Sequence, residues 1–321
     1  MNAAPLNTVF LDYDTVSDGD LDLTALREAC GNLILYDSSA AHTAERIRAA
    51  DVVLLNKLEL RRDALFGAAN LRLVALAATG TNNVDLIAAR ERGIAVCNVR
   101  AYCTASVVQH VWGLILSLTQ HVREFSRLSQ DGSWGRDESS VLLSHPVREL
   151  QGRIFGVVGW GELGRGAARI AEAFGMRILI ANRPGLPPQA GRVPLDELLA
   201  TADIVSLHCP LNDATRGLIG SRELALMKPD ALLINTARGG LIDGAALAAA
   251  LKAGRLGGAG IDVLPQEPPH AAEPLIDAQI PNLLVTPHIA WAAREARQRC
   301  IDEMAANIRD FRSGGRRGRV V

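Results

Sequence analysis

The chain has few cysteines and no excess of charge of either sign. Only five of its 321 residues are cysteine, and none of them forms a C-x-x-C pair. An odd number of scattered cysteines is not typical of a disulfide framework, so we expect a reducing compartment. Lys and Arg total 34 against 35 for Asp and Glu. This balance argues against nucleic acid or an anionic membrane as a partner.

A long hydrophobic run is also lacking. No apolar stretch reaches the roughly 20 residues of a membrane-spanning helix. Residues 1–5 show no basic region followed by an apolar core, which a signal peptide would have. No spacing of His, Cys and Asp is typical of a metal site. Hydrophobic residues nevertheless make up 48% of the chain. We therefore expect a cytoplasmic protein, and its length favours two domains.

Short apolar runs alternate with amphipathic helical stretches, which predicts parallel sheets with helices on both faces. The expected strands are 9–12, 33–36, 52–55, 73–77, 94–97, 154–158, 176–181, 204–208, 231–235, 258–262 and 283–286. The expected helices include 24–30, 43–50, 85–92, 105–118 and 294–312. We predict two doubly wound α/β domains, Rossmann-like or flavodoxin-like, with a ligand-binding cleft between them. Residues 1–100 plus 289–321 form one domain, and residues 101–288 form the other.

Three glycines follow the expected strand at 154–158 in G-x-G-x-x-G spacing. Gly159 permits a tight turn, Gly161 lets the backbone approach a pyrophosphate, and Gly164 lets helix and strand pack closely. The helix that follows offers free N–H groups and its positive dipole end to phosphates. Glycine triplets also occur by chance in loops. The strand before, the helix after and a second strand at the right distance favour a dinucleotide site.

Polar side chains stand at the carboxyl ends of three expected strands, where open α/β sheets place their sites. Arg238 can hold a substrate carboxylate in two hydrogen bonds. His288 suits proton donation near neutral pH, and Glu267 can orient it. Each residue alone is more often a surface residue, but together they indicate catalysis. His208 ends another strand and is expected to line the site, whereas His110 on an apolar helix is expected to be a packed or interface histidine.

Seven segments together resemble one family. They are 78–85, 149–152, 159–164, 208–211, 235–243, 262–268 and 287–288. The chain resembles the D-isomer-specific 2-hydroxyacid dehydrogenases. Within that family it is most similar to glycerate dehydrogenases, also called hydroxypyruvate reductases. The resemblance implies an NAD(P)-dependent enzyme that reduces hydroxypyruvate or glyoxylate to D-glycerate or glycolate.

The resemblance also assigns roles to individual residues. Arg238, Glu267 and His288 fill the catalytic positions, with His288 as general acid. Backbone N–H groups near Thr79 and Gly80 grip the substrate carboxylate from the other domain. The implied cofactor-binding residues are Gly159, Gly161, Glu162, Leu163, Gly164, Asn182, Arg183, His208, Cys209, Pro210, Thr215, Thr236, Ala237 and Asp262. A homodimer is implied, with residues 105–118 in the contact.

One departure concerns the choice of cofactor. Dinucleotide folds generally carry an acidic residue after the second strand, where it binds the adenosine ribose hydroxyls. Here Asn182 and Arg183 stand in that place. An arginine can pair with a 2′-phosphate, so we expect NADPH to be accepted. The alternative is that Arg183 only points to solvent, and a strong preference for NADH would favour it.

Alternatives remain open at this stage. Two hypotheses compete with the hydroxypyruvate reductase. One is a dehydrogenase for another 2-oxo acid, such as 3-phosphohydroxypyruvate. The other is a dinucleotide-sensing protein like the corepressors that resemble this family. Glu267 argues against a formate dehydrogenase, because those enzymes have glutamine beside the histidine. The sequence does not assign roles to Lys57, Trp134 and Trp291.

Overall fold

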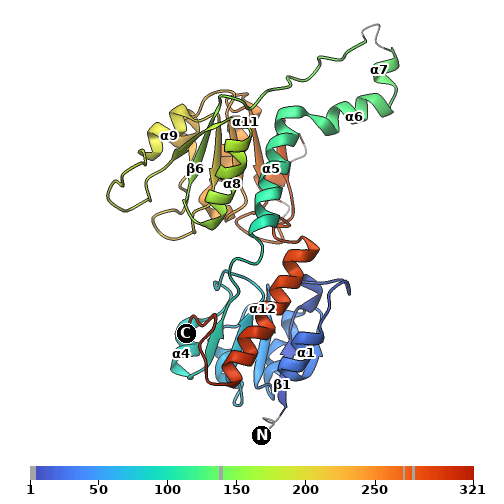
Figure 1. The fold of residues 1–321 in the computed structure, drawn as a ribbon, viewed down its shortest axis with the longest axis vertical. Coiled ribbons are helices and arrows are strands. Elements are labelled where there is room, and N and C mark those ends of the chain that lie inside the picture. The colour runs from blue at the N-terminus through green and yellow to red at the C-terminus, as the bar shows by residue number, and fades with distance from the viewer. Residues whose placement is uncertain (1–4, 137–139, 270–271, 277–278) are drawn as a thin grey trace. The chain divides into compact units, whose positions relative to one another are not determined.

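The computed structural model describes residues 5–136, 140–269, 272–276 and 279–321. The expectation about a signal peptide falls on residues 1–4, which lie outside them. The chain divides into two compact units. Unit 1 is Met1–Cys103 with Trp291–Val321, and unit 2 is Thr104–Ala290. Each unit is built on one parallel sheet (Figure 1), so the predicted fold class of two parallel-sheet α/β domains is confirmed.

Unit 1 contains a five-stranded sheet in the order β2-β1-β3-β4-β5, with every pair parallel. This is the flavodoxin-like strand order. The strands are β1 (Leu6–Phe10), β2 (Gly31–Leu35), β3 (Val52–Leu55), β4 (Leu73–Leu76) and β5 (Ala95–Cys97). The helices are α1 (Thr24–Cys30), α2 (Thr43–Ile47), α3 (Arg62–Gly67), α4 (Leu86–Glu91) and α12 (Arg294–Arg312), with short 3-10 turns at Tyr13–Thr15 and Ala40–His42.

Both faces of this sheet are buried. Successive strand side chains point to opposite faces, and in β3 Val52 and Leu54 join one core while Val53 and Leu55 join the other. The first core is closed by α1 and α12, and the second by α2, α3 and α4. Because helices cover both faces of the sheet, a strand such as β3 is apolar at every position and does not alternate between apolar and polar residues.

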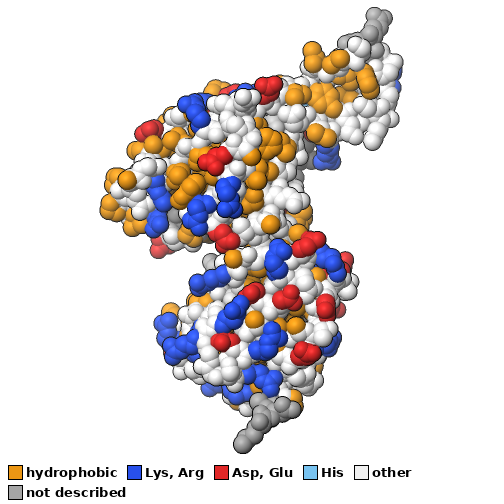
Figure 2. All heavy atoms as spheres, in the orientation of Figure 1, with side chains coloured by type: hydrophobic (Ala, Val, Ile, Leu, Met, Phe, Trp, Pro, Cys, Tyr) orange, Lys and Arg blue, Asp and Glu red, His pale blue; other side chains and the backbone are white. Residues whose placement is uncertain are grey.

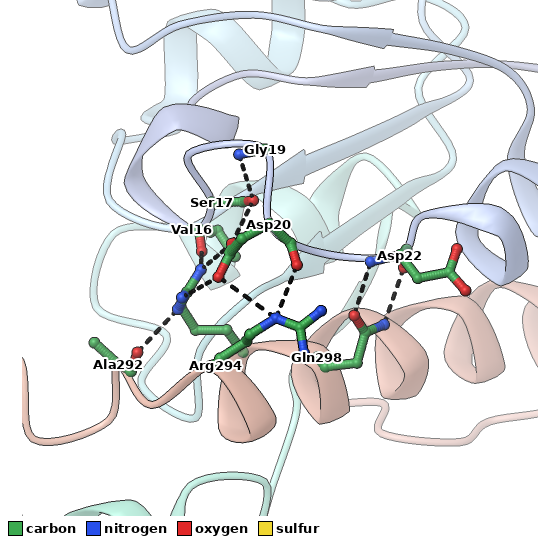
Figure 3. Close-up of polar contacts among 9 residues, drawn as sticks. Val16, Ser17, Gly19, Asp20, Asp22, Ala292, Arg294 and Gln298 are labelled. Carbon is green, nitrogen blue, oxygen red and sulfur yellow. Dashed lines mark hydrogen bonds and ion pairs between the residues drawn. The ribbon is translucent and has the colours of Figure 1, made fainter.

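Helix α12 returns to unit 1 from the far end of the chain and is held there by ion pairs (Figure 3). Asp20 accepts two hydrogen bonds from Arg297, both at 2.7 Å. Arg297 also donates to the carbonyl oxygen of Val16, at 3.0 Å. Arg294 lies against the Asp20 loop, and Gln298 pairs with the backbone of Asp22. These contacts fix the start of α12 to the loop after β1.

We expect the Asp20–Arg297 pair to make stability depend on pH. Its hydrogen bonds from Arg297 hold the pKa of the Asp20 carboxyl well below its usual range. The stabilisation is therefore complete above about pH 4, the unfolded pKa of Asp, and is lost as the pH falls toward the folded value. Asp20→Asn should lower Tm at pH 7, and the difference from wild type should shrink below about pH 4.

Thermal unfolding of both proteins between neutral and acidic pH measures this difference. Asp63→Asn, which changes an exposed carboxylate on α3, is the control. Equal Tm values for Asp20→Asn and wild type at pH 7 would contradict the account.

Unit 2 contains a six-stranded parallel sheet in the order β11-β10-β9-β8-β6-β7. The strands are β6 (Ile154–Val158), β7 (Arg177–Ile180), β8 (Ile204–Leu207), β9 (Leu232–Asn235), β10 (Gly258–Ile261) and β11 (Leu283–Val285). An isolated parallel β-bridge between Ala181 and Val193 adds a one-residue strand position beside β7. With that bridge, the order is the common dinucleotide-binding arrangement, 3-2-1-4-5-6, and β11 extends it as a seventh strand.

Helices cover this sheet, and α5 (Thr104–Gln120) packs on α8 (Glu162–Ala173). The other helices are α6 (Val122–Gln130), α7 (Ser133–Arg136), α9 (Leu195–Thr201), α10 (Ser221–Leu226) and α11 (Gly244–Lys252), with 3-10 turns at Gly239–Leu241 and Pro274–Ile276. Helices α6 and α7 project away from the sheet of unit 2 (Figure 1). Apolar side chains gather over this projection (Figure 2), and Val122, Trp134 and Leu143 are exposed there.

The expected elements are present, but several bounds are wrong. The first strand was placed at 9–12 and lies at Leu6–Phe10. Asp12 leaves the strand because its buried carboxylate accepts hydrogen bonds from the backbone of residues 56–58. Helix α2 ends at Ile47, three residues before the expected end. Among the described residues, no helix is long and apolar enough to cross a membrane.

Candidate active site

The loop between β6 and α8 has a geometry that only glycine allows. Gly159 has φ +106°, and a Cβ there would lie 2.5 Å from the backbone of His208 and Cys209. A Cβ on Gly164 would lie 2.1 Å from the carbonyl oxygen of Gly159. Gly161 has open space around it and precedes the first turn of α8. The backbone is thus open to a ligand at Gly161 and tightly packed at the other two positions.

This loop lies where the direction of strand order reverses. From β6 the sheet continues to β7 on one side and to β8 on the other. In open α/β sheets, such a switch point at the carboxyl ends of the strands is where ligands bind. The loop after β8 lies directly against Gly159, and the His208 N–H donates to the carbonyl oxygen of Val158. Glu162 begins α8, and its carboxylate accepts a bond from Thr104.

The loop after β8 is held by its own hydrogen bonds. The Thr215 hydroxyl donates to the Pro210 carbonyl oxygen at 2.7 Å and accepts from the Asn212 N–H at 2.8 Å. Thr215 is buried, so its hydroxyl shapes this loop. Burial lowers the pKa of His208 to about 4. His208 is therefore neutral at neutral pH, and it is a poor proton donor for that reason.

The turn after β9 carries Arg238. Asn235 fixes the turn, because its side chain accepts from the Ala237 N–H and donates to the Arg238 carbonyl oxygen. A Cβ on Gly239 would lie 2.0 Å from the Leu264 carbonyl carbon, so this turn is pressed against the loop that leads to Glu267. The Arg238 side chain is exposed, and its Nη1 donates to the Ala237 carbonyl oxygen at 2.7 Å.

Glu267 and His288 form a pair. His288 Nδ1 lies 2.5 Å from Glu267 Oε2, and Oε1 of the same carboxylate accepts from the Leu264 N–H at 2.9 Å. A carboxylate can only accept, so Nδ1 carries the hydrogen and Nε2 is left for another partner. His288 has a left-handed backbone, with φ +55°. Its N–H donates to the carbonyl oxygen of Asp262, which holds this conformation.

Three buried side-chain atoms of unit 2 have no partner among the described residues, namely Gln189 Oε1, His208 Nδ1 and Thr236 Oγ1. His208 follows β8, which borders the switch point, and Thr236 follows the next strand, β9. Orphaned buried polar groups are costly unless a ligand or water bonds them. A nicotinamide dinucleotide fits this set, because it brings phosphates to the glycine loop and polar groups to the strand ends.

The end of β7 differs from the common acidic pattern. The Asn182 N–H donates to the Val193 carbonyl oxygen, and Asn182 Oδ1 accepts from the Gln189 N–H at 3.1 Å. Asn182 therefore holds the loop that follows. Arg183 is exposed, so its guanidinium can reach a ligand in solvent.

Unit 1 holds the Thr79–Gly80 loop by a separate set of bonds. The Asn98 side chain donates to the Thr79 carbonyl oxygen at 2.7 Å, and the Thr79 hydroxyl donates to that of Val99. Among the described residues, the N–H groups of Thr79 and Gly80 have no acceptor. Lys57 Nζ lies 6.0 Å from the ring centre of Trp291, and Trp291 packs on the unit 1 core.

Sequence reasoning missed the side chains that hold the segment carrying His288 in place. The family resemblance implies that Asp262 is a cofactor-binding residue. Its buried carboxylate also accepts the N–H groups of Ile289 and Ala290, both at 2.9 Å. His110 bonds Thr286 across 176 positions of the chain, and no local pattern signals such a contact. Groups of His, Cys, Asp or Glu suited to a metal ion are absent from the described part of the chain.

Comparisons with known proteins agree with this geometry. The family model for the NAD binding domain of D-isomer specific 2-hydroxyacid dehydrogenases matches residues 112–290. A glycerate dehydrogenase of Methylorubrum extorquens is 42% identical over 270 residues, which are 84% of this chain and 85% of that protein. A hydroxypyruvate reductase of Blautia hydrogenotrophica is 37% identical over 317 residues, 96% of this chain and 98% of that protein.

A solved structure is similar over nearly the whole length. The crystal structure of a Thermus thermophilus protein matches with a TM-score of 0.86 at 33% identity, and it covers 98% of this chain and 99% of that one. Family model, relatives and fold agree, so the resemblance seen in the sequence is confirmed. The chain belongs to the D-isomer-specific 2-hydroxyacid dehydrogenases, which are oxidoreductases with a nicotinamide dinucleotide-binding domain.

Proposed function

We propose that this enzyme reduces hydroxypyruvate and glyoxylate to D-glycerate and glycolate. The observation that carries the proposal is the His288–Glu267 pair, held in the same unit as the glycine loop at the switch point. The names of the relatives, glycerate dehydrogenase and hydroxypyruvate reductase, support this substrate class. Glu267 fixes Nδ1 of His288 and leaves Nε2 available to a substrate oxygen.

A nicotinamide dinucleotide held at the loop of Gly159, Gly161 and Gly164 would supply the hydride that reduces the substrate carbonyl. As the C–H bond forms, the electrons of the C=O double bond move to the oxygen, and His288 gives that oxygen its Nε2 proton. Glu267 keeps Nδ1 protonated and the ring oriented while this happens. Arg238 holds the substrate carboxylate in a two-bond fork.

We further propose that NADPH is accepted and preferred. Arg183 is exposed at the end of β7, and residues 181–183 include no acid that would repel a 2′-phosphate. Asn182→Asp should reverse this preference, because the carboxylate still accepts the Gln189 N–H but adds a negative charge. We expect kcat/KM for NADPH to fall by about 10-fold or more, with little change for NADH.

The ratio of kcat/KM for the two cofactors, measured in wild type, Asn182→Asp and Arg183→Ala, tests this prediction. Arg169→Ala, which removes an exposed arginine on α8, is the control. A wild-type enzyme that strongly prefers NADH would overturn the NADPH proposal, and the proposed reaction would stand.

The stereochemical outcome tests the reaction. The enzyme should oxidise D-glycerate with the oxidised cofactor and leave L-glycerate unchanged. Oxidation of L-glycerate alone would contradict the proposal.

We also propose a homodimer, because α6 and α7 expose an apolar surface that a second copy would cover. Sedimentation velocity of wild type and a Trp134→Glu/Leu143→Glu double variant tests the dimer.

A further inference from the structure

His110, on α5, is bonded to the segment that carries His288. His110 Nε2 lies 2.9 Å from Thr286 Oγ1, and Thr286 Oγ1 lies 2.5 Å from Asp262 Oδ1. The Asp262 carboxylate can only accept, so the Thr286 hydroxyl donates to it. That hydroxyl must then accept from His110, which fixes the hydrogen of His110 on Nε2. The three side chains form a directed chain, from His110 to Thr286 to Asp262.

Asp262 in turn holds the backbone at His288 and at the two residues that follow it. Its carboxylate accepts the N–H groups of Ile289 and Ala290, and its carbonyl oxygen accepts that of His288. The Asp262 side chain has no exposed surface, so its charge depends entirely on these donors. Removing one donor leaves a buried carboxylate with an unmet acceptor and loosens the segment that it holds.

His288 needs this support, because its φ of +55° is a conformation that residues other than glycine rarely adopt. A left-handed backbone persists only where neighbouring groups hold it. The ring of His288 is fixed by Glu267 at Nδ1, but the position of Nε2 also depends on the backbone. An error of about 1 Å in such a group can lower a rate by roughly 100-fold.

We infer that His110 is a positioning residue for His288, acting through Thr286 and Asp262. The inference rests on the proposed function, because that function makes His288 the proton donor. The side chain of His110 is 20% exposed and contacts the network from α5, so it does not touch the reacting atoms in this scheme. It acts by keeping the Thr286 hydroxyl directed at the Asp262 carboxylate.

Two matched pairs of variants test the inference. His110→Leu fills similar space without a donor, whereas His110→Gln keeps an N–H near the position of Nε2. Thr286→Val removes the hydroxyl, and Thr286→Ser keeps it. We expect His110→Leu and Thr286→Val to lower kcat by about 10- to 100-fold, with the dissociation constant of NADPH unchanged. The Gln and Ser variants should recover most of kcat, which a purely space-filling role would not produce.

The double variant His110→Leu/Thr286→Val should lose no more kcat than Thr286→Val alone, because both changes break one chain of bonds. Hydrogen exchange in the cofactor-free protein gives a readout besides activity. Amides in a peptide covering residues 286–292 should exchange roughly fivefold faster in His110→Leu than in wild type or His110→Gln. If exchange and kcat in His110→Leu match wild type, the inference is wrong.

These outcomes are distinguishable from failure of the proposed function. A wild-type enzyme that turns over no 2-oxo acid would refute the function, while the exchange comparison would still decide whether His110 holds the segment. An active wild type with a fully active His110→Leu would refute only the positioning role. If His110→Leu does not fold, the Thr286→Val and Thr286→Ser pair carries the same test.

Discussion

Replacing His288 with alanine should lower kcat by roughly two to four orders of magnitude, the usual contribution of general acid catalysis. Without the imidazole, the carbonyl oxygen must take its proton from water as the hydride arrives. Steady-state kinetics with hydroxypyruvate measures the change. The dissociation constant of NADPH should stay the same, because the glycine loop and the turns after β8 and β9 remain intact.

His288→Asn is the matched control for the backbone. Asparagine tolerates the left-handed conformation better than alanine does, and the native residue has φ +55°. The two variants should be equally inactive if the imidazole itself matters. Activity in His288→Asn within a few fold of wild type would show that the backbone conformation, and not proton donation, is what His288 supplies.

Arg238→Ala should lower kcat/KM for the 2-oxo acid by about 100- to 1,000-fold, which is the value of two charge-assisted hydrogen bonds. The exposed guanidinium donates from Nη1 to the Ala237 carbonyl oxygen, and its remaining N–H groups can bind a substrate carboxylate. Binding of NADPH, measured by titration, should be unaffected. Loss of cofactor affinity instead of substrate use would contradict the clamp role.

Arg238→Lys separates charge from geometry. Lysine keeps the positive charge but cannot make the planar two-bond fork. We expect it to recover only part of the lost kcat/KM. Full recovery would mean that a point charge suffices, and the fork would then have no role in holding the carboxylate.

The glycine loop was the part of the site that the sequence predicted best. Gly159 and Gly164 stand where a Cβ would strike backbone atoms within 2.5 Å, so only one residue type fits and its spacing is informative. The strand ends were nearly as predictable, because apolar runs stop where the chain leaves a sheet buried on both faces. The bounds of β1 were wrong because a tertiary contact of Asp12 decides where that strand ends.

The support behind His288 was not predictable from the sequence. Asp262 reads as one more polar residue after a strand, and His110 as one more residue on an apolar helix. Their roles depend on contacts over 24 and 176 positions of the chain. Local periodicity carries no signal at such separations, so the structure is needed to find them.

The most direct test follows the near-ultraviolet absorbance of NADPH and NADH with the purified enzyme and four acids: hydroxypyruvate, glyoxylate, pyruvate and 3-phosphohydroxypyruvate. The account predicts the highest kcat/KM with hydroxypyruvate, appreciable turnover of glyoxylate, and faster reaction with NADPH. Preference for 3-phosphohydroxypyruvate would contradict the proposed substrate. Absence of oxidation with every acid, together with measurable cofactor binding, would contradict the central claim that this site is a hydroxypyruvate reductase.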